Sequence, residues 1–162
     1  MRSNPRSSRS HPMDGEENEP RLFSLSEAER ARREVEPLLV EAMEVRRKAE
    51  ELDEKLSAVS NRILMMGGLT IQYEAVARLR LEHDRLETRV KDAIERIQNT
   101  GCVVKDLDSG LVDFPSIINN EEVYLCWRLG EDRIRFYHRQ DEGFAGRKPI
   151  DPNDTGPKHP IQ

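Results

Sequence analysis

Apolar residues recur three and four positions apart along two long stretches of the chain. In the first stretch the apolar positions are Ala31, Val35, Leu38, Ala42, Val45, Ala49, Leu52, Leu56, Val59, Ile63 and Met66. In the second stretch they are Val76, Leu79, Leu86, Val90, Ala93 and Ile97, and His83 lies in the same seam. This spacing predicts two amphipathic helices of the coiled-coil kind. Because Met65-Met66-Gly67-Gly68 separates the two helices, they are expected to form an antiparallel hairpin.

The first predicted helix has a recognisable start and one internal conflict. In Ser24-Leu25-Ser26-Glu27 the side chains of Ser24 and Glu27 can each cap the backbone N–H of the other, which is the capping-box pattern. Phe23 and Ala28 can add a hydrophobic staple across this cap. Pro37 has no backbone N–H and its ring crowds the preceding turn, so a kink or a break is expected there.

After Gly101 the spacing of the apolar residues changes to two, which predicts short strands. The clearest unit joins residues 123–129 to residues 132–138 through a two-residue Gly130-Glu131 turn. Its predicted register pairs Trp127 with Ile134, Leu125 with Phe136, and Val123 with His138. The opposite face of this hairpin then carries Tyr124, Cys126, Arg128, Arg133, Arg135 and Tyr137.

These elements predict an α+β protein in which a long, coiled-coil-like antiparallel helical hairpin precedes a small antiparallel β-sheet. We assign residues 22–100 to the hairpin and residues 101–150 to a β subdomain packed on it. Residues 1–21 and 151–162 have few side chains to bury and are expected to be disordered tails. Several seam positions of the first helix are alanines, which bury little area, so association of two hairpins would complete the helical core.

The composition narrows the class of protein. The chain has 162 residues, of which 36% are hydrophobic, 5% aromatic and 35% charged, and this argues against a large catalytic domain. A net charge of -5 argues against general binding of nucleic acid. The sequence shows neither a membrane-spanning stretch nor a secretory signal, so a cytoplasmic location with no membrane partner is expected. Cys102 and Cys126 are then two buried thiols rather than a disulfide.

Several strings in the second half of the chain resemble one known family. They are Val104-Lys105-Asp106, Gly110-Leu111-Val112-Asp113-Phe114-Pro115, Leu125-Cys126-Trp127-Arg128-Leu129-Gly130-Glu131, His138 and Gly143-Phe144-Ala145-Gly146-Arg147. Together with the start of the first helix they resemble the prokaryotic family catalogued as domain of unknown function 2203, over about residues 22–150. The resemblance supports the architecture and implies no activity, substrate or cofactor.

Acidic residues and one histidine are expected near one end of the small sheet. The candidate metal ligands are Asp106, Asp108, Asp113, His138 and Glu142. Oxygen and imidazole ligands suit a divalent ion with open coordination positions, which is the one cofactor the sequence suggests. Their spacing is not diagnostic, since Asp108-Ser109-Gly110 is also an ordinary turn sequence.

A second candidate site lies in the glycine-containing segment before the last strand. Gly143 and Gly146 allow backbone N–H groups to converge, and Arg147 can bind a carboxylate or a phosphate. These three residues and Trp127 are the candidates for ligand or anion binding. In the alternative interpretation Arg147 is structural and pairs with an acid such as Asp113.

Three functions are compatible with these observations. The first is a non-catalytic binding or adaptor module, which uses the helical hairpin and the sheet end around His138 and Arg147 to bind a protein or a second copy of the chain. The second is a small metal-dependent hydrolase that uses Asp106, Asp113 and His138. The third is RNA binding through the face of arginines and tyrosines on the β-hairpin. Cys126 is not expected to be a nucleophile, because no histidine shares its face in the predicted register. The sequence leaves open whether the protein is an enzyme.

Overall fold

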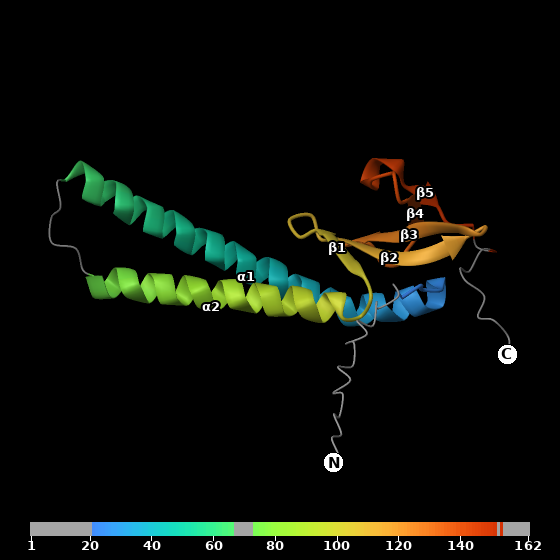
Figure 1. The fold of residues 1–162 in the computed structure, drawn as a ribbon, viewed down its shortest axis with the longest axis horizontal. Helices are drawn as coiled ribbons and strands as arrows, with labels where there is room; N and C mark the ends of the chain where they lie inside the picture. The colour runs from blue at the N-terminus through green and yellow to red at the C-terminus, as the bar shows by residue number, and fades with distance from the viewer. Residues whose placement is uncertain (1–20, 67–72, 152, 154–162) are drawn as a thin grey trace, which may run out of the picture.

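The computed structural model describes residues 21–66, 73–151 and 153, and has the predicted α+β architecture (Figure 1). Its elements in chain order are α1 (Leu25–Met65), α2 (Tyr73–Gln98), β1 (Val103–Asp106), β2 (Leu111–Ile118), β3 (Glu121–Arg128), β4 (Phe136–Arg139), the 3₁₀ helix η1 (Phe144–Gly146) and β5 (Lys148–Pro149). The predicted glycine cap at Gly67 or Gly68 and nearly all of the two predicted tails lie outside the described residues.

The five strands form one antiparallel sheet in the order β1-β2-β3-β4-β5. Figure 1 shows this sheet lying over the N-terminal part of α1, while the two helices run on together well past the sheet. The turn between β2 and β3 consists of Asn119 and Asn120, both with positive φ (51° and 63°). Two such residues are what a type I′ hairpin turn requires, and this turn aligns β2 with β3 over their full length.

The core lies between one face of the sheet and the start of the hairpin. Its largest fully buried side chains include Trp127, Phe114 and Leu125 from the sheet and Phe23 and Leu39 from the helical part. The rings of Phe23 and Phe114 meet edge to face, with centroids 5.5 Å apart. A smaller cluster of Val45, Ala49, Leu52 and Leu86 continues the packing along the hairpin.

The start of α1 confirms the predicted N-cap. Ser24 Oγ accepts a hydrogen bond from the backbone N–H of Glu27 at 3.2 Å, and Phe23 and Ala28 are both buried beside this cap. Of the kink or break predicted at Pro37, the break is absent, because α1 is continuous from Leu25 to Met65. Pro37 and Arg33 are exposed, so water can bond the carbonyl that proline leaves without a helical donor.

The predicted register between β3 and β4 is wrong by one residue. Tyr124 pairs with His138 and Cys126 with Phe136, whereas the predicted partner of His138 was Val123. Because side chains alternate between the faces of a strand, this shift moves His138 to the face that carries Cys126. The shift also separates Tyr124 from Tyr137, so the face of arginines and tyrosines on which the RNA-binding hypothesis rested does not form.

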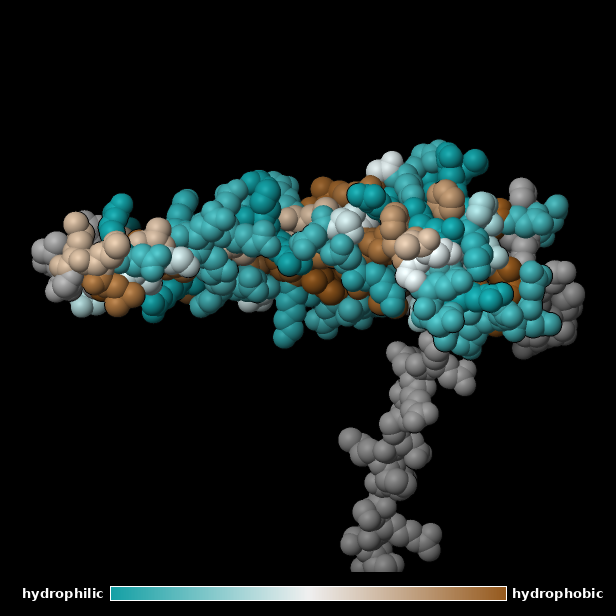
Figure 2. Space-filling model, turned by 90° about the horizontal axis from the view of Figure 1, so that it is seen from above, coloured by the Kyte–Doolittle hydropathy of each residue, from teal (hydrophilic) through white to brown (hydrophobic). Residues whose placement is uncertain are grey.

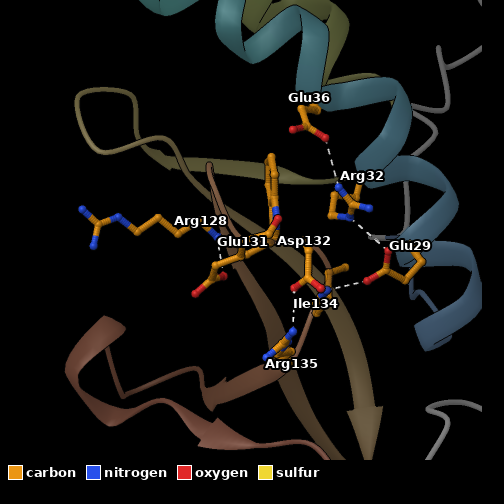
Figure 3. A network of polar contacts seen from close by, with 9 residues as sticks. Glu29, Arg32, Glu36, Arg128, Glu131, Asp132, Ile134 and Arg135 are labelled. Atoms are coloured by element: carbon orange, nitrogen blue, oxygen red, sulfur yellow. Dashed lines mark hydrogen bonds and ion pairs between the residues drawn. The ribbon is translucent and has the colours of Figure 1, made fainter.

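The register differs because residues 129–135 form a loop anchored on α1 in place of a two-residue turn (Figure 3). The loop begins with a turn in which the N–H of Glu131 donates to the carbonyl of Arg128, and Gly130 has a φ of 103°. At the other end of the loop the N–H of Ile134 donates to the carboxylate of Glu29 in α1.

Arg32 holds this anchoring carboxylate in place. Its guanidinium contacts Glu29 and Glu36 at 3.0 Å each, and it is buried beside the ring of Trp127.

Neither α1 nor α2 contains the apolar run that crossing a bilayer would need.

Candidate metal centre

Three adjacent strands bring one metal-ligating side chain each to the same point of the sheet. Asp113 in β2 lies directly opposite Cys126 in β3, and His138 in β4 lies opposite Tyr124, two residues from Cys126. All three side chains therefore share the face that points away from the Trp127 core. Asp113 and Cys126 are 0% exposed and His138 is 4% exposed. One ligand atom from each residue lies within 4.8 Å of the other two.

The hydrogen bonds of His138 define where its protons are. His138 Nδ1 lies 2.8 Å from the carbonyl oxygen of Arg139, and a carbonyl can only accept, so Nδ1 carries a hydrogen. His138 Nε2 lies 2.9 Å from Asp113 Oδ2. This second bond needs one further proton, held either by the imidazole or by the carboxyl group. The pair thus holds a single proton at a position that a cation can occupy instead.

Asp113 has hydrogen-bonding capacity left over. Within the described part of the chain its Oδ1 is buried and lacks a hydrogen bond of regular geometry. Burial raises the pKa of Asp113, and the positive charge of His138 and an interaction with the Cys126 thiol work against this rise. A buried carboxylate oxygen without a regular hydrogen bond is costly, and a bound cation would satisfy it.

Cys126 is protonated in the metal-free site. Burial raises the pKa of Cys126 to about 12, and the neighbouring Asp113 carboxylate adds to this shift by disfavouring a second negative charge. A thiol in this state is a poor nucleophile, although His138 does share its face, contrary to the prediction. The thiolate form would need a cation directly bound to the sulfur.

Cationic side chains stacked on aromatic rings surround the centre. The Arg147 guanidinium lies 4.2 Å from the ring centre of Phe136 and 4.6 Å from that of Phe144. Its Nη2 contacts both carboxylate oxygens of Glu131 at 2.7 Å and lies 3.4 Å from the carbonyl oxygen of Cys126. The positive charge of Arg147 works against the rise in the pKa of Cys126.

On the histidine side the ring of Tyr124 packs beside His138. It lies 5.5 Å from the His138 ring, centre to centre, and Lys105 Nζ lies 4.9 Å from the Tyr124 ring centre. The Asp113, Cys126 and His138 side chains are therefore enclosed on both sides by packed side chains.

Of the predicted metal ligands, Asp113 and His138 come together and the other three lie elsewhere. Asp106 accepts hydrogen bonds from the Ser109 hydroxyl and the Asp108 N–H, and these bonds lower its pKa. Asp108 itself lies 3.4 Å from Arg46 of α1. Each of these groups is satisfied within the β1–β2 turn or against α1.

Glu142 also has local partners. It accepts the backbone N–H of Arg139 and contacts Lys148 Nζ at 3.2 Å, and the first of these bonds is the main cause of its lowered pKa. The third member of the cluster is Cys126, which the predicted register had placed on the face opposite to His138. The signal in the sequence that pointed to a buried polar partner is Asp113, an acid inside the mostly apolar strand β2.

The predicted anion-binding residues have structural contacts in this conformation. Arg147 pairs with Glu131 rather than with Asp113, and its side chain is 12% exposed. Trp127 is fully buried and donates its indole N–H to the carbonyl of Glu131 at 2.9 Å. Gly143 precedes η1 with an extended backbone, and Gly146 packs against the side chain of Glu142.

Comparison with known proteins yields a family and nothing more specific. A family model described as an uncharacterized conserved protein, DUF2203, matches residues 21–150. This range includes both helices, all five strands and the whole candidate centre. No curated protein and no solved structure matches the chain.

Proposed function

The chain belongs to the uncharacterised DUF2203 family, and from the geometry of its buried site we propose that it binds one divalent transition metal ion at Asp113, Cys126 and His138. Zinc fits this site best. The observation that carries the proposal is the convergence of three buried ligand atoms within 4.8 Å of one another, beside a carboxylate oxygen that lacks a hydrogen bond of regular geometry. The three side chains already lie together on one face of the sheet, so metal binding needs no change of strand register.

The set of donor atoms selects the class of metal. Thiolate, imidazole and carboxylate together suit zinc, whereas calcium and magnesium prefer sites made of oxygen atoms alone. Ligand atoms about 2.0–2.3 Å from a tetrahedral zinc ion are roughly 3.3–3.7 Å apart. The three ligand atoms already lie within 4.8 Å of one another, so small side-chain shifts bring them to this spacing. Metal binding would displace the proton held between His138 and Asp113 and the proton of the Cys126 thiol.

The second coordination shell is already in place. A metal-bound histidine usually donates its other ring N–H to a carbonyl or carboxylate, which fixes the ring. His138 makes this bond through Nδ1 to the carbonyl of Arg139. The Nε2 atom is thereby directed at the position where the ion would lie.

Three protein ligands leave the fourth position of a tetrahedral zinc ion to water, as in catalytic sites, but the burial of all three ligands favours a structural role for the ion. It would join β2, β3 and β4 and stabilise the sheet that packs on α1. A hydrolase needs a metal open to substrate and water. In addition, Asp106, the third ligand of the predicted hydrolase, is bonded to Ser109 and Asp108. Metal binding is therefore proposed without a catalytic step.

The test is the metal content of untagged protein purified without chelator, together with reconstitution of chelator-treated protein by zinc or cobalt. Cys126→Ser and Asp113→Asn remove ligands, and Cys102→Ser and Asp106→Asn are matched controls. Cys102 is also buried but lies outside the cluster, where Thr100 donates to its sulfur. The expected result is close to one metal per chain in the wild type and both controls, and a loss of at least tenfold in affinity in the ligand variants.

A cobalt titration guards against misfolded variants. Cobalt bound to a thiolate shows a charge-transfer absorption, which the wild type and Cys102→Ser should show and folded Cys126→Ser should lack. Circular dichroism of each metal-free variant verifies its folding. Folded wild-type protein that takes up neither zinc nor cobalt would refute the proposal.

A further inference from the structure

The far half of the helical hairpin contains no buried side chain among the described residues. We define the distal hairpin as residues 53–65 of α1 and residues 73–85 of α2. The last buried residues before it are Leu52 on α1 and Leu86 on α2. Figure 1 shows the two helices drawing apart toward this end. Each helical segment is about 20 Å long, at about 1.5 Å per residue.

The apolar seam nevertheless continues through the distal hairpin with unchanged spacing. Its apolar members are Leu56, Val59 and Ile63 on α1 and Val76 and Leu79 on α2, and all are only half-buried. The polar member, His83 of α2, is also half-buried and lies 3.0 Å from Asp53 of α1. Next to the seam lie Leu64, Met65 and Tyr73, which are 81%, 89% and 76% exposed. In Figure 2 apolar side chains gather at this free end of the molecule. A single hairpin thus leaves much of its own seam in contact with water.

The charges of the distal hairpin indicate what covers it. Its acidic residues are Asp53, Glu54, Glu74, Glu82 and Asp84, and its basic residues are Lys55, Arg62, Arg78, Arg80 and Arg85. The two sets are equal in number, so this surface is neutral although the whole chain carries -5. A neutral surface of mixed sign does not repel a copy of itself, while an anionic membrane or a nucleic acid would favour a basic one.

We propose that a second copy of this chain covers the distal hairpin. The two hairpins pack antiparallel about a twofold axis and form a four-helix bundle. The half-buried seam residues of both copies become its core, and the mixed charges pair across its rim. The sheet and the candidate metal centre lie outside the bundle, so this inference does not depend on the proposed metal binding.

The test is the mass of the full chain in solution, measured by sedimentation equilibrium over a range of concentrations. The wild type is expected to be a dimer at micromolar concentration. The double variant Ile63→Glu with Leu79→Glu is expected to be a monomer, with at least a hundredfold weaker association. Val40→Glu is the matched control, because Val40 is a 45% exposed apolar residue of α1 outside the distal hairpin. The control should remain a dimer.

A second measurement locates the contact. Ala58→Cys places an exposed thiol beside the seam and near the middle of the distal hairpin, where the twofold axis passes, while both native cysteines are buried, so mild oxidation should give a disulfide-linked dimer. Circular dichroism verifies that each variant keeps its helices. A wild type that stays monomeric at 100 micromolar, or a folded double variant that still dimerises, would overturn the proposal. Monomers that instead sediment with lipid vesicles would also overturn it and would assign the patch to a membrane surface.

Discussion

His138 and Asp113 share one proton at the centre of the sheet. Nε2 of the histidine lies 2.9 Å from Oδ2 of the aspartate, and the Arg139 carbonyl fixes the other ring nitrogen as a donor. Both side chains are almost completely removed from water. The pair is therefore a polar contact in which each group depends on the other for its compensation.

Removing one member of this pair is expected to destabilise the metal-free protein strongly. His138→Ala leaves Asp113 buried without its partner, and we expect a loss of about 3–5 kcal/mol in the free energy of unfolding. Urea denaturation of chelator-treated protein measures this loss. Asp106→Ala, which alters an exposed turn, should change the free energy of unfolding far less. A His138→Ala variant as stable as the wild type would show that the pair contributes nothing to the fold.

Zinc is expected to stabilise the protein and to do so more strongly as the pH rises. At a free concentration 100 times the Kd, a ligand adds about 2.7 kcal/mol to the free energy of unfolding. Binding displaces two protons, one from the thiol and one from the His138–Asp113 pair, so the affinity should rise up to about 100-fold per pH unit. Calorimetry in buffers of different ionisation enthalpy counts the protons. A count of zero would mean that zinc binds elsewhere.

The thiol of Cys126 is expected to make the metal-free protein sensitive to alkali. Its pKa is about 12 in the fold, while a thiol in the unfolded chain ionises near 8.5. The contribution is fully present below the unfolded pKa and is lost as the pH rises toward 12, because only the unfolded state releases the proton in this window. The slope for one site is at most about 1.4 kcal/mol per pH unit.

A comparison with Cys126→Ala isolates this contribution from those of other groups. The stability difference between the wild type and this variant should shrink between pH 9 and the pKa of about 12, measured by urea denaturation. A constant difference across that range would show that the thiol ionises equally in both states.

The contact between Glu131 and Arg147 is expected to stabilise the loop that sets the register of β4. Glu131→Gln loses the charge that holds Arg147 at 2.7 Å, and we expect a cost of about 1.5–3 kcal/mol. Glu121→Gln is the control, because its pair with Arg139 is exposed and should contribute about 1 kcal/mol or less. Thermal unfolding of both variants tests the difference. Equal effects would show that the Glu131–Arg147 pair contributes no more than an exposed ion pair.

The helices were predictable because their signals are local. The repeat of apolar residues and the Ser24 cap each involve residues that lie within a few helical turns of one another. The structure confirms the helices and the cap. The β3–β4 register depended instead on a contact between Glu29 and Ile134, which are 105 residues apart. No local pattern reveals such a contact, and Gly130-Glu131 by itself favours the tight turn that was predicted.

The candidate centre was predictable only in part for the same reason. Asp113 and His138 were singled out as metal-binding residue types, and the structure brings them together. Cys126 was missed because an error of one residue in register exchanges the faces of a strand. Asp106 and Asp108 belong to a turn, and their local hydrogen bonds satisfy them without an ion.

The order of the strands has a consequence for how the chain folds. Each strand pairs with its neighbour in sequence, so the sheet closes through short loops that cost little entropy. Phe23 reaches the sheet by contrast across 93 residues, where its carbonyl accepts the Ser116 hydroxyl at 2.6 Å. Contacts between distant residues form slowly. The start of α1, although it is synthesised before the sheet, is therefore expected to dock last and to complete the core at the end of folding.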